Sequence, residues 1–317
     1  MKKNIDLSIV IPVYNSEDTI ETVVEDSISV VEELNDIQSL EIILVNDGSE
    51  DDVLSVCKGL CESAPQVKLI NLTKNYGQHS ALMAGYKFAK GDFVLTMDDD
   101  GQTPPKEIPK LIKEIKKGHD VVYGSYKKKK HSWFRNLGSN FNNKMANWLW
   151  NKPRDLDLSS FFVVKKSIIK KILNYYGPFP RIPGLIFRVT LDATNVRVKH
   201  EERDTGESNY TLGRLISLWL EGFTNFSIKP LRIASFFGGL FATIGFLGII
   251  AVIVRKLVMP DIQVGWSSLI VVITFFGGVQ LISLGLVGEY VGRIFMHLNN
   301  EPQYEIRETF DIEDKSY

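Results

Sequence analysis

The first 125 residues alternate between short, unbroken apolar runs and longer stretches in which apolar residues recur at helical spacing. Apolar runs rich in β-branched side chains are typical of strands that are buried on both faces. We expect such strands at Leu7–Val13, Glu41–Val45, Val67–Leu72, Asp92–Met97 and Asp120–Tyr123. The stretches between them predict helices at about Ser16–Leu34, Asp51–Cys61, Gln78–Ala89 and Pro104–Lys117. This alternation predicts an α/β fold in which helices cover both faces of a parallel sheet.

Two long uncharged runs, Ser235–Val254 and Gly265–Gly288, lie in the last third of the chain. Each can cross a hydrocarbon core of roughly 30 Å at about 1.5 Å per residue. We expect two transmembrane helices, at about 233–258 and 265–290, within a membrane segment at residues 231–296. Their glycines permit close helix contact and association between copies of the chain. The alternative is a pair of helices buried in a large soluble core.

The segments on either side of this pair are shorter and more polar. Residues 211–230 carry apolar residues at helical spacing together with Trp219 and Phe226. This pattern predicts either a helix that lies in the membrane interface or an ordinary amphipathic packing helix. Residues 297–317 form a polar tail with a strand-like piece at Gln303–Arg307. Residues 1–210 remain as one α/β domain.

Basic residues near the two uncharged runs indicate an orientation. Two spans place both ends of the chain on the same side of a membrane. The basic residues outside the pair are Arg214, Lys229, Arg232 and Arg293, whereas the short connecting loop holds Arg255 and Lys256. The excess outside the pair favours a cytoplasmic N-terminal domain in a multi-pass inner-membrane protein.

Overall charge and cysteine content narrow the class of protein. The chain has 37 Lys and Arg against 38 Asp and Glu, so its formal net charge is −1. Without a basic field, a dedicated nucleic-acid binder is not expected. Its two cysteines, Cys57 and Cys61, lie at helical spacing among apolar residues and indicate a buried helix face rather than a metal site. The absence of a disulfide framework favours a reducing compartment.

Three consecutive acids, Asp98, Asp99 and Asp100, follow the fourth expected strand. Ligands of parallel α/β sheets bind beyond the carboxyl ends of the strands, where these residues fall. Alternate residues of an extended segment point the same way, so Asp98 and Asp100 can share a cation while Asp99 turns elsewhere. Hard carboxylate ligands suit Mg²⁺ or Mn²⁺. The alternative is a solvated acidic loop.

Four motifs resemble the GT-A glycosyltransferases of family 2. They are Ser8-Ile9-Val10-Ile11-Pro12-Val13-Tyr14-Asn15, Val45-Asn46-Asp47-Gly48-Ser49, Asn75-Tyr76-Gly77-Gln78 with Ala84-Gly85 and Gly91-Asp92, and Asp98-x-Asp100-x-Gln102-x-Pro104-Pro105. The resemblance implies a Rossmann-like, mostly parallel GT-A domain over residues 1–210, followed by the interfacial helix and the transmembrane pair.

Later motifs are similar to those of the polyprenyl-phosphate glycosyltransferases, which include dolichol-phosphate mannosyltransferases and bacterial undecaprenyl-phosphate transferases. These motifs are Arg203-Asp204-Thr205-Gly206-Glu207-Ser208-Asn209-Tyr210, Lys229-Pro230-Leu231-Arg232, and Gly285 to Arg293. Ser132-Trp133-Phe134-Arg135 and Gly206-Glu207-Ser208 resemble, within that group, the transferases for 4-deoxy-4-formamido-L-arabinose. The resemblance implies sugar transfer from a nucleotide donor, with UDP preferred, to a polyprenyl phosphate at the membrane.

The same resemblance implies roles for individual residues. Around the nucleotide it places Pro12, Tyr14, Asn15, Asp47, Asn75, Gln78, Asp99 and Ser208, with Asp47 on the base or ribose. It assigns the metal on the diphosphate to Asp98, Asp100 and Gln102, and a phosphate to Arg203. An acid in the acceptor region corresponds best to Asp157.

The sequence departs from the family pattern at three positions. Asn46 replaces a common Asp, Asn209 stands where Lys is frequent, and Tyr126 occupies a position where Arg often occurs. The run Lys127–Lys130 is either a compensating phosphate contact or a solvated charged face. Alternative functions are a processive glycosyltransferase of the same fold and a non-catalytic nucleotide-sugar sensor or flippase partner at the membrane.

Overall fold

A computed structural model of the protein describes residues 6–126, 156–199, 265–299 and 301–312, together with isolated helical positions between 236 and 258. Several of the residues singled out above lie outside the described part of the chain: Arg203, Ser208, Asn209, the lysine run and the expected interfacial helix at 211–230.

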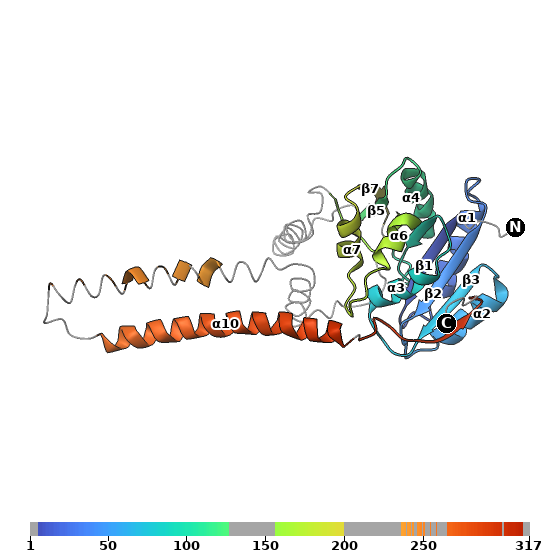
Figure 1. The fold of residues 1–317 in the computed structure, drawn as a ribbon. Coiled ribbons are helices and arrows are strands. Elements are labelled where there is room, and N and C mark those ends of the chain that lie inside the picture. Colours follow the sequence, from blue (N-terminus) through green and yellow to red (C-terminus); the bar gives the residue numbers. More distant parts are fainter. Residues whose placement is uncertain are drawn as a thin grey trace. The chain divides into compact units, whose positions relative to one another are not determined.

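An eight-stranded sheet organises the described residues, in the order β7-β5-β6-β4-β1-β2-β3-β8. Its strands are β1 (Leu7–Val13), β2 (Leu40–Asn46), β3 (Val67–Leu72), β4 (Phe93–Thr96), β5 (Val121–Tyr126), β6 (Phe162–Lys165), β7 (Ala193–Val198) and β8 (Ile306–Phe310). Strands β1, β2, β3, β5 and β7 are labelled in Figure 1. All seven residues of β1 are buried, as its unbroken apolar sequence predicts. The five strands expected from the sequence are all present, with ends that differ by at most three residues.

The sheet is mostly parallel, with two antiparallel exceptions. Strands β4, β1, β2 and β3 pair in parallel, as do β5 and β7. Strand β6 pairs antiparallel with both β4 and β5, and β8 pairs antiparallel with β3. The expectation of a mostly parallel sheet is confirmed. The positions of β6 and β8 were not predicted, because local apolar runs do not indicate which strands a distant segment will pair with.

Helices cover both faces of the sheet. On one face α1 (Ile20–Glu32), α2 (Val53–Ser63) and α4 (Ile108–Ile115), preceded by the short 3₁₀ helix η1 (Pro105–Glu107), share a core with the odd-numbered residues of β1. On the other face lies α3 (Gln78–Phe88), where a Cβ on Gly85 would approach Val10 Cγ1 to 2.4 Å. The helices α6 (Lys166–Ile172) and α7 (Ile182–Val189) contact each other beside β6, and Phe187 stacks on Tyr123.

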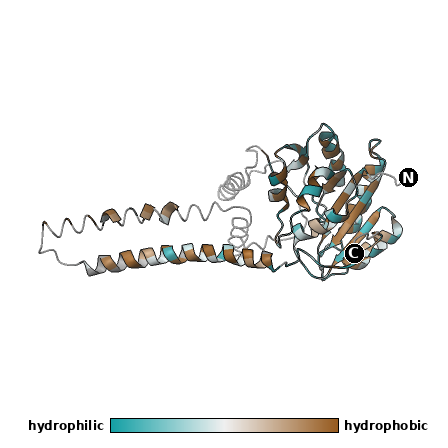
Figure 2. Cartoon of the chain, viewed as in Figure 1, coloured by the Kyte–Doolittle hydropathy of each residue, from teal (hydrophilic) through white to brown (hydrophobic). Residues whose placement is uncertain are grey.

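A long apolar helix, α10 (Trp266–Leu298), belongs to a second compact unit, residues 209–299. Within it, Phe275–Met296 is the one helical segment of the described residues that is long and apolar enough to cross a membrane. In Figure 2 the long helix α10 is coloured mainly brown and white, with a few teal positions. Only isolated positions of the first uncharged run are described, so the two-helix hairpin remains a prediction.

The chain after α10 returns to the first unit, which comprises residues 1–208 and 300–317. The strand of this tail is Ile306–Phe310, three residues later than the expected Gln303–Arg307. The sheet explains the shift, since β8 takes its register from β3, with Thr309 opposite Ile70. The polar tail is thus a structural part of the α/β unit.

Candidate active site

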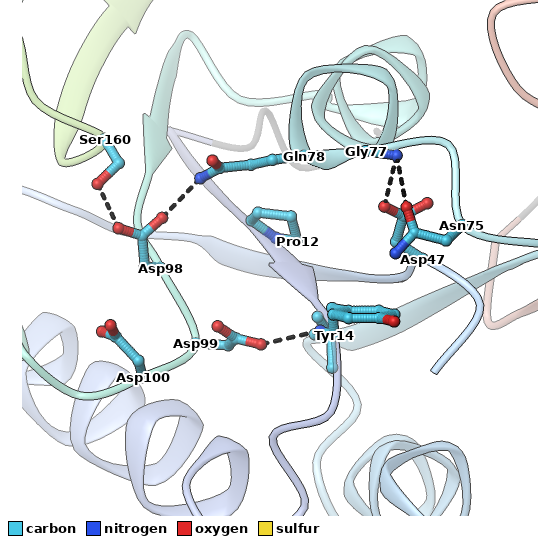
Figure 3. Close-up of a pocket in the computed structure, with 11 residues that line it drawn as sticks. Pro12, Tyr14, Asp47, Asn75, Gly77, Gln78, Asp98, Asp99, Asp100 and Ser160 are labelled. Carbon is cyan, nitrogen blue, oxygen red and sulfur yellow. Dashed lines mark hydrogen bonds between the residues drawn. The ribbon is translucent and has the colours of Figure 1, made fainter. Parts of the chain in front are cut away.

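A cavity of about 340 Å³ opens at the carboxyl ends of β1, β2 and β4, beside the start of α3 (Figure 3). This edge is where parallel α/β sheets bind ligands, because the loops that follow the strands converge there. The lining residues are Pro12, Val13, Tyr14, Asp47, Asn75, Gly77, Gln78, Asp98, Asp99, Asp100 and Ser160. Eight of the residues expected from the sequence lie in this list, namely Pro12, Tyr14, Asp47, Asn75, Gln78, Asp98, Asp99 and Asp100.

Asp98 lines the cavity two residues after the end of β4. Gln78 Nε2 donates to Asp98 Oδ1 at 2.7 Å, and the Ser160 hydroxyl donates to Oδ2 (Figure 3). Burial raises the pKa of Asp98 to about 6; the bond from Ser160 opposes this rise, and the neighbouring Asp100 and Asp99 add to it. An opposite charge in the cavity would favour the ionised form.

The side chain of Asp99 turns away from Asp98, toward β1. Its Oδ2 accepts a hydrogen bond from the backbone N–H of Tyr14 at 2.9 Å, and its carbonyl oxygen accepts one from Thr19 Oγ1 at 2.6 Å. Burial raises the pKa of Asp99 as well, against the lowering effect of the nearby Ser16 hydroxyl and of the bond from the Tyr14 N–H. Asp99 therefore ties the loop after β4 to the end of β1.

Asp100 lines the cavity and also shapes its own turn. Its Oδ1 accepts the backbone N–H of Gln102 at 3.0 Å, while Gly101 adopts a positive φ of 68°. Gln102 itself is not among the residues that line the cavity. All three acids line the cavity; Asp99 is bonded to the Tyr14 N–H, which leaves Asp98 and Asp100 as the two candidate cation ligands.

The carboxylates that line the cavity resemble the ligand set of one kind of divalent-cation site. Among the described residues, no group of three His, Cys, Asp or Glu side chains is close enough to hold a metal by itself. Mg²⁺ and similar ions are commonly bound through one or two carboxylates plus substrate phosphates. Two carboxylates beside an open cavity fit that kind of site, and they do not fit a closed structural metal centre.

Asp47 anchors the opposite side of the cavity. Its two carboxylate oxygens accept the backbone N–H groups of Tyr76 and Gly77 at 2.7 and 2.8 Å. Figure 3 shows the bond from Gly77. The side chain is 3% exposed, and burial raises its pKa against the lowering effect of the two backbone bonds. Gly48 follows with a φ of 67°, and a Cβ there would lie 2.4 Å from the carbonyl carbon of Lys74. Asp47 thereby fixes the loop that leads into α3.

The two residues after β1 take different positions. The Tyr14 side chain is 45% exposed and lines the cavity. Asn15 has a left-handed φ of 51°, its N–H donates to Ser49 Oγ at 3.2 Å, and its Oδ1 accepts the N–H of Glu50 at 2.8 Å. Asn15 is not among the residues that line the cavity, so it connects two loops instead.

Asp157, the expected acceptor-region acid, is not among the residues that line the cavity. Its Oδ2 accepts a hydrogen bond from Ser125 Oγ at 2.9 Å, and its backbone pairs with the Asn195 side chain. The residue from this segment that does reach the cavity is Ser160, which sequence reasoning missed. Its position directly before the apolar residues that form β6 was the available signal.

A mostly parallel sheet with helices on both faces and a carboxylate-lined cavity at its carboxyl edge is typical of a GT-A glycosyltransferase domain. The chain belongs to glycosyl transferase family 2, whose match covers residues 8–173.

Curated relatives match nearly the whole chain. It is 32% identical to the uncharacterized glycosyltransferase YkcC of Bacillus subtilis (strain 168), over 99% of this chain and 97% of that protein. It is 34% identical to the undecaprenyl-phosphate 4-deoxy-4-formamido-L-arabinose transferase of Edwardsiella ictaluri (strain 93-146), over 95% of this chain and 93% of that protein. Among solved structures, mannosyl-3-phosphoglycerate synthase from Rubrobacter xylanophilus shares the fold, with a TM-score of 0.50 and 15% identity over 72% of this chain and 74% of that one.

Proposed function

We propose that this family 2 glycosyltransferase moves a sugar, with inversion, from a nucleotide donor to undecaprenyl or another polyprenyl phosphate at the cytoplasmic face of the inner membrane. The observation that carries the proposal is the cavity, where Asp98 and Asp100 face the space beyond the sheet. The names of relatives about 34% identical over nearly the full length support the lipid acceptor. UDP is the preferred carrier by the same resemblance.

In the proposed reaction, an oxygen of the lipid phosphate attacks the anomeric carbon, and the bond from that carbon to the nucleoside diphosphate breaks. The acceptor phosphate is ionised at neutral pH, so no strong general base is required. The main contribution to the activation barrier is the cost of developing negative charge on the leaving diphosphate. A bound Mg²⁺ or Mn²⁺ would supply charge neutralisation there, held by Asp98 and Asp100, with Gln102 as a third expected ligand.

The remaining residues orient these groups. Gln78 and Ser160 hold Asp98 through both of its oxygens. Asp47 fixes the loop that contains Asn75, so that the nucleotide side of the cavity keeps its shape. Arg203 is our candidate for a phosphate contact, Ser208 for the shape of the same loop, and Asp157 for an acid near the acceptor.

Membrane attachment would hold this domain where the acceptor lies. The segment Phe275–Met296 of α10 suits one span, and the uncharged run at about 233–258 supplies the second in our proposal. The proposed organisation is a GT-A domain at residues 1–210, an interfacial helix at 211–230, a hairpin at 231–296 and the tail at 297–317, with association between copies through the glycine-rich spans.

Calorimetry and a transfer assay test the proposal together. Detergent-solubilised full-length protein is titrated with UDP or GDP with and without Mn²⁺, and sugar transfer to undecaprenyl phosphate is measured in parallel. We expect Mn²⁺-dependent binding and transfer by the wild type, and loss of transfer in Asp100→Ala. Wild-type transfer rates in Asp100→Ala would refute the metal assignment, and nucleotide binding without any lipid product would favour a sensor or flippase partner.

A further inference from the structure

Four hydrogen bonds in series connect the loop after β1 with the C-terminal strand. The N–H of Asn15 donates to Ser49 Oγ at 3.2 Å, and the Ser49 hydroxyl donates to Asn46 Oδ1 at 2.6 Å. Asn46 Nδ2 then donates to Asn71 Oδ1 at 2.9 Å, and Asn71 Nδ2 donates to Glu308 Oε1 at 3.0 Å. These five residues are called the amide relay below. Every donor in it points toward Glu308.

The amide relay crosses the sheet at the carboxyl ends of β1, β2 and β3 and ends on β8. Two of its five members are deeply buried, since Asn46 and Asn71 are each 3% exposed. Buried polar groups of this kind cost free energy unless each donor and acceptor has a partner. The relay therefore has to be satisfied as a unit.

The direction of the relay follows from its terminal residue. The Glu308 carboxylate has no proton to give, so it can only accept, and Asn71 must turn its NH₂ group toward it. The Asn71 carbonyl oxygen then faces position 46, which must donate. An Asp at position 46 would place a carboxylate against that carbonyl oxygen. Asn46 is thus the residue type that Glu308 requires.

The amide relay reaches the cavity at two places. Asn46 immediately precedes Asp47, and Asn15 immediately follows Tyr14; Asp47 and Tyr14 both line the cavity. Ser49 joins the two loops, because it accepts from Asn15 and donates to Asn46. A change in the relay therefore displaces residues adjacent to two lining side chains.

The start of β8 and the residue before it also hold the loop after β3, through one backbone carbonyl and one side chain. The N–H of Thr73 donates to the Glu305 carbonyl oxygen at 3.0 Å, and Arg307 Nη2 donates to the Thr73 carbonyl oxygen at 3.0 Å. This loop continues to Asn75 and Gly77, which line the cavity. The tail thus contacts two of the loops that shape the nucleotide side.

We infer that β8 is a positioning element of the donor site and that it acts through the amide relay. Asn46 and Glu308 form a matched pair in the relay, because Glu308 can only accept a hydrogen bond and the residue at position 46 must therefore donate one. The inference rests on the proposed function for the identity of the ligand. It gives the segment after α10 a role in donor binding, beyond completing the sheet edge.

Exchange of the matched pair tests the inference. In Asn46→Asp, the carboxylate faces the Asn71 carbonyl oxygen, and rotation of Asn71 only moves the conflict to Glu308. In Glu308→Gln, the new amide can still accept from Asn71, so this variant also controls for loss of the ion pair with Lys58 at 3.3 Å. In the double variant Asn46→Asp/Glu308→Gln, the relay can reverse, because the introduced glutamine donates to Asn71 and Asn71 donates to the introduced aspartate.

The measurements are the Kd for UDP or GDP, whichever the wild type binds, with Mn²⁺ in full-length protein, the KM and kcat of transfer, and the thermal unfolding temperature. We expect Glu308→Gln to remain within about threefold of wild type. Asn46→Asp should lose about tenfold in Kd and in donor KM with a smaller change in kcat, as for one unsatisfied buried group. The double variant should regain most of that loss.

The outcomes separate the two proposals. Absence of nucleotide binding by the wild type would refute the proposed function. If the wild type binds and Asn46→Asp binds equally well, with or without a lower unfolding temperature, the relay does not position the donor site. If Asn46→Asp is impaired or unfolded and the double variant is no better, the matched pair is wrong. Recovery of both binding and folding in the double variant supports the inference.

Discussion

The substitution Asp47→Asn probes the cavity with almost no change in shape. The Asp47 carboxylate accepts two backbone N–H groups, from Tyr76 and Gly77, and it is 3% exposed. An Asn has one acceptor oxygen and one NH₂ group at these positions, so one backbone donor would face another donor. A buried donor without a partner costs about 1–3 kcal/mol.

This cost gives a measurable change in stability and binding. At roughly 2–4 °C per kcal/mol for a domain of this size, Asp47→Asn should lower the unfolding temperature by about 2–12 °C. Nucleotide affinity should fall too, because the Asn75–Gly77 loop lines the cavity. The assays are differential scanning fluorimetry and calorimetric titration on full-length protein.

The matched control is Asp52→Asn. Asp52 is exposed, and within the described part of the chain its side chain accepts from Ser55 Oγ in the same turn, at 2.7 Å. This variant should stay within about 0.5 kcal/mol of wild type. Equal unfolding temperature and equal nucleotide affinity for Asp47→Asn and wild type would refute the role given to Asp47.

The serine beside Asp98, the packing of α3 and the titration of Asp98 each give a further prediction. Ser160→Ala removes a donor to Asp98 and should weaken Mn²⁺-dependent nucleotide binding about tenfold, as expected for a hydrogen bond to a charged group. The control is Ser159→Ala, which should not weaken binding because the Ser159 hydroxyl donates to a backbone carbonyl. Equal effects of the two variants in calorimetry would contradict this. Gly85→Ala places a Cβ 2.4 Å from a valine methyl and should lower the free energy of unfolding by about 1–3 kcal/mol. Gly59→Ala should raise it, because a Cβ at position 59 has no neighbouring atom within 4 Å. Burial raises the pKa of Asp98 to about 6, so without a cation its contribution to stability is present below pH 4 and is lost as the pH rises through 6. Asp98→Asn should therefore flatten this part of the pH dependence of the unfolding free energy. Identical pH profiles for this variant and the wild type would exclude the shift.

Much of the fold could be predicted from local patterns. Strand β1 at Leu7–Val13 and strand β3 at Val67–Leu72 have the expected ends, since unbroken apolar runs specify strands buried on both faces. Helix α1 begins at Ile20 rather than Ser16, because residues 16–19 form a turn whose Thr19 side chain bonds to the Asp99 carbonyl oxygen. That contact spans 80 residues and has no local signature.

The site was predictable where residues follow strands directly. Asp47, Asp98 and Asp100 reach the cavity because each lies just beyond the carboxyl end of a strand. Ser160 was missed because it comes from the segment before β6, whose antiparallel insertion between β4 and β5 is a tertiary arrangement. The pairing of Asn46 with Asn71, and of Asn71 with Glu308, likewise depends on which strands are neighbours.

Mass spectrometry of lipid products tests the central claim most directly. Membranes that contain the full-length protein are incubated with undecaprenyl phosphate and a panel of UDP- and GDP-linked sugars, with Asp100→Ala membranes in parallel. The account predicts one or more undecaprenyl-phosphate sugars, formed only by the wild type and only with a divalent cation. The contradictory result is the same set of products from both membranes, or no lipid-linked sugar with any donor while the wild type still binds nucleotide.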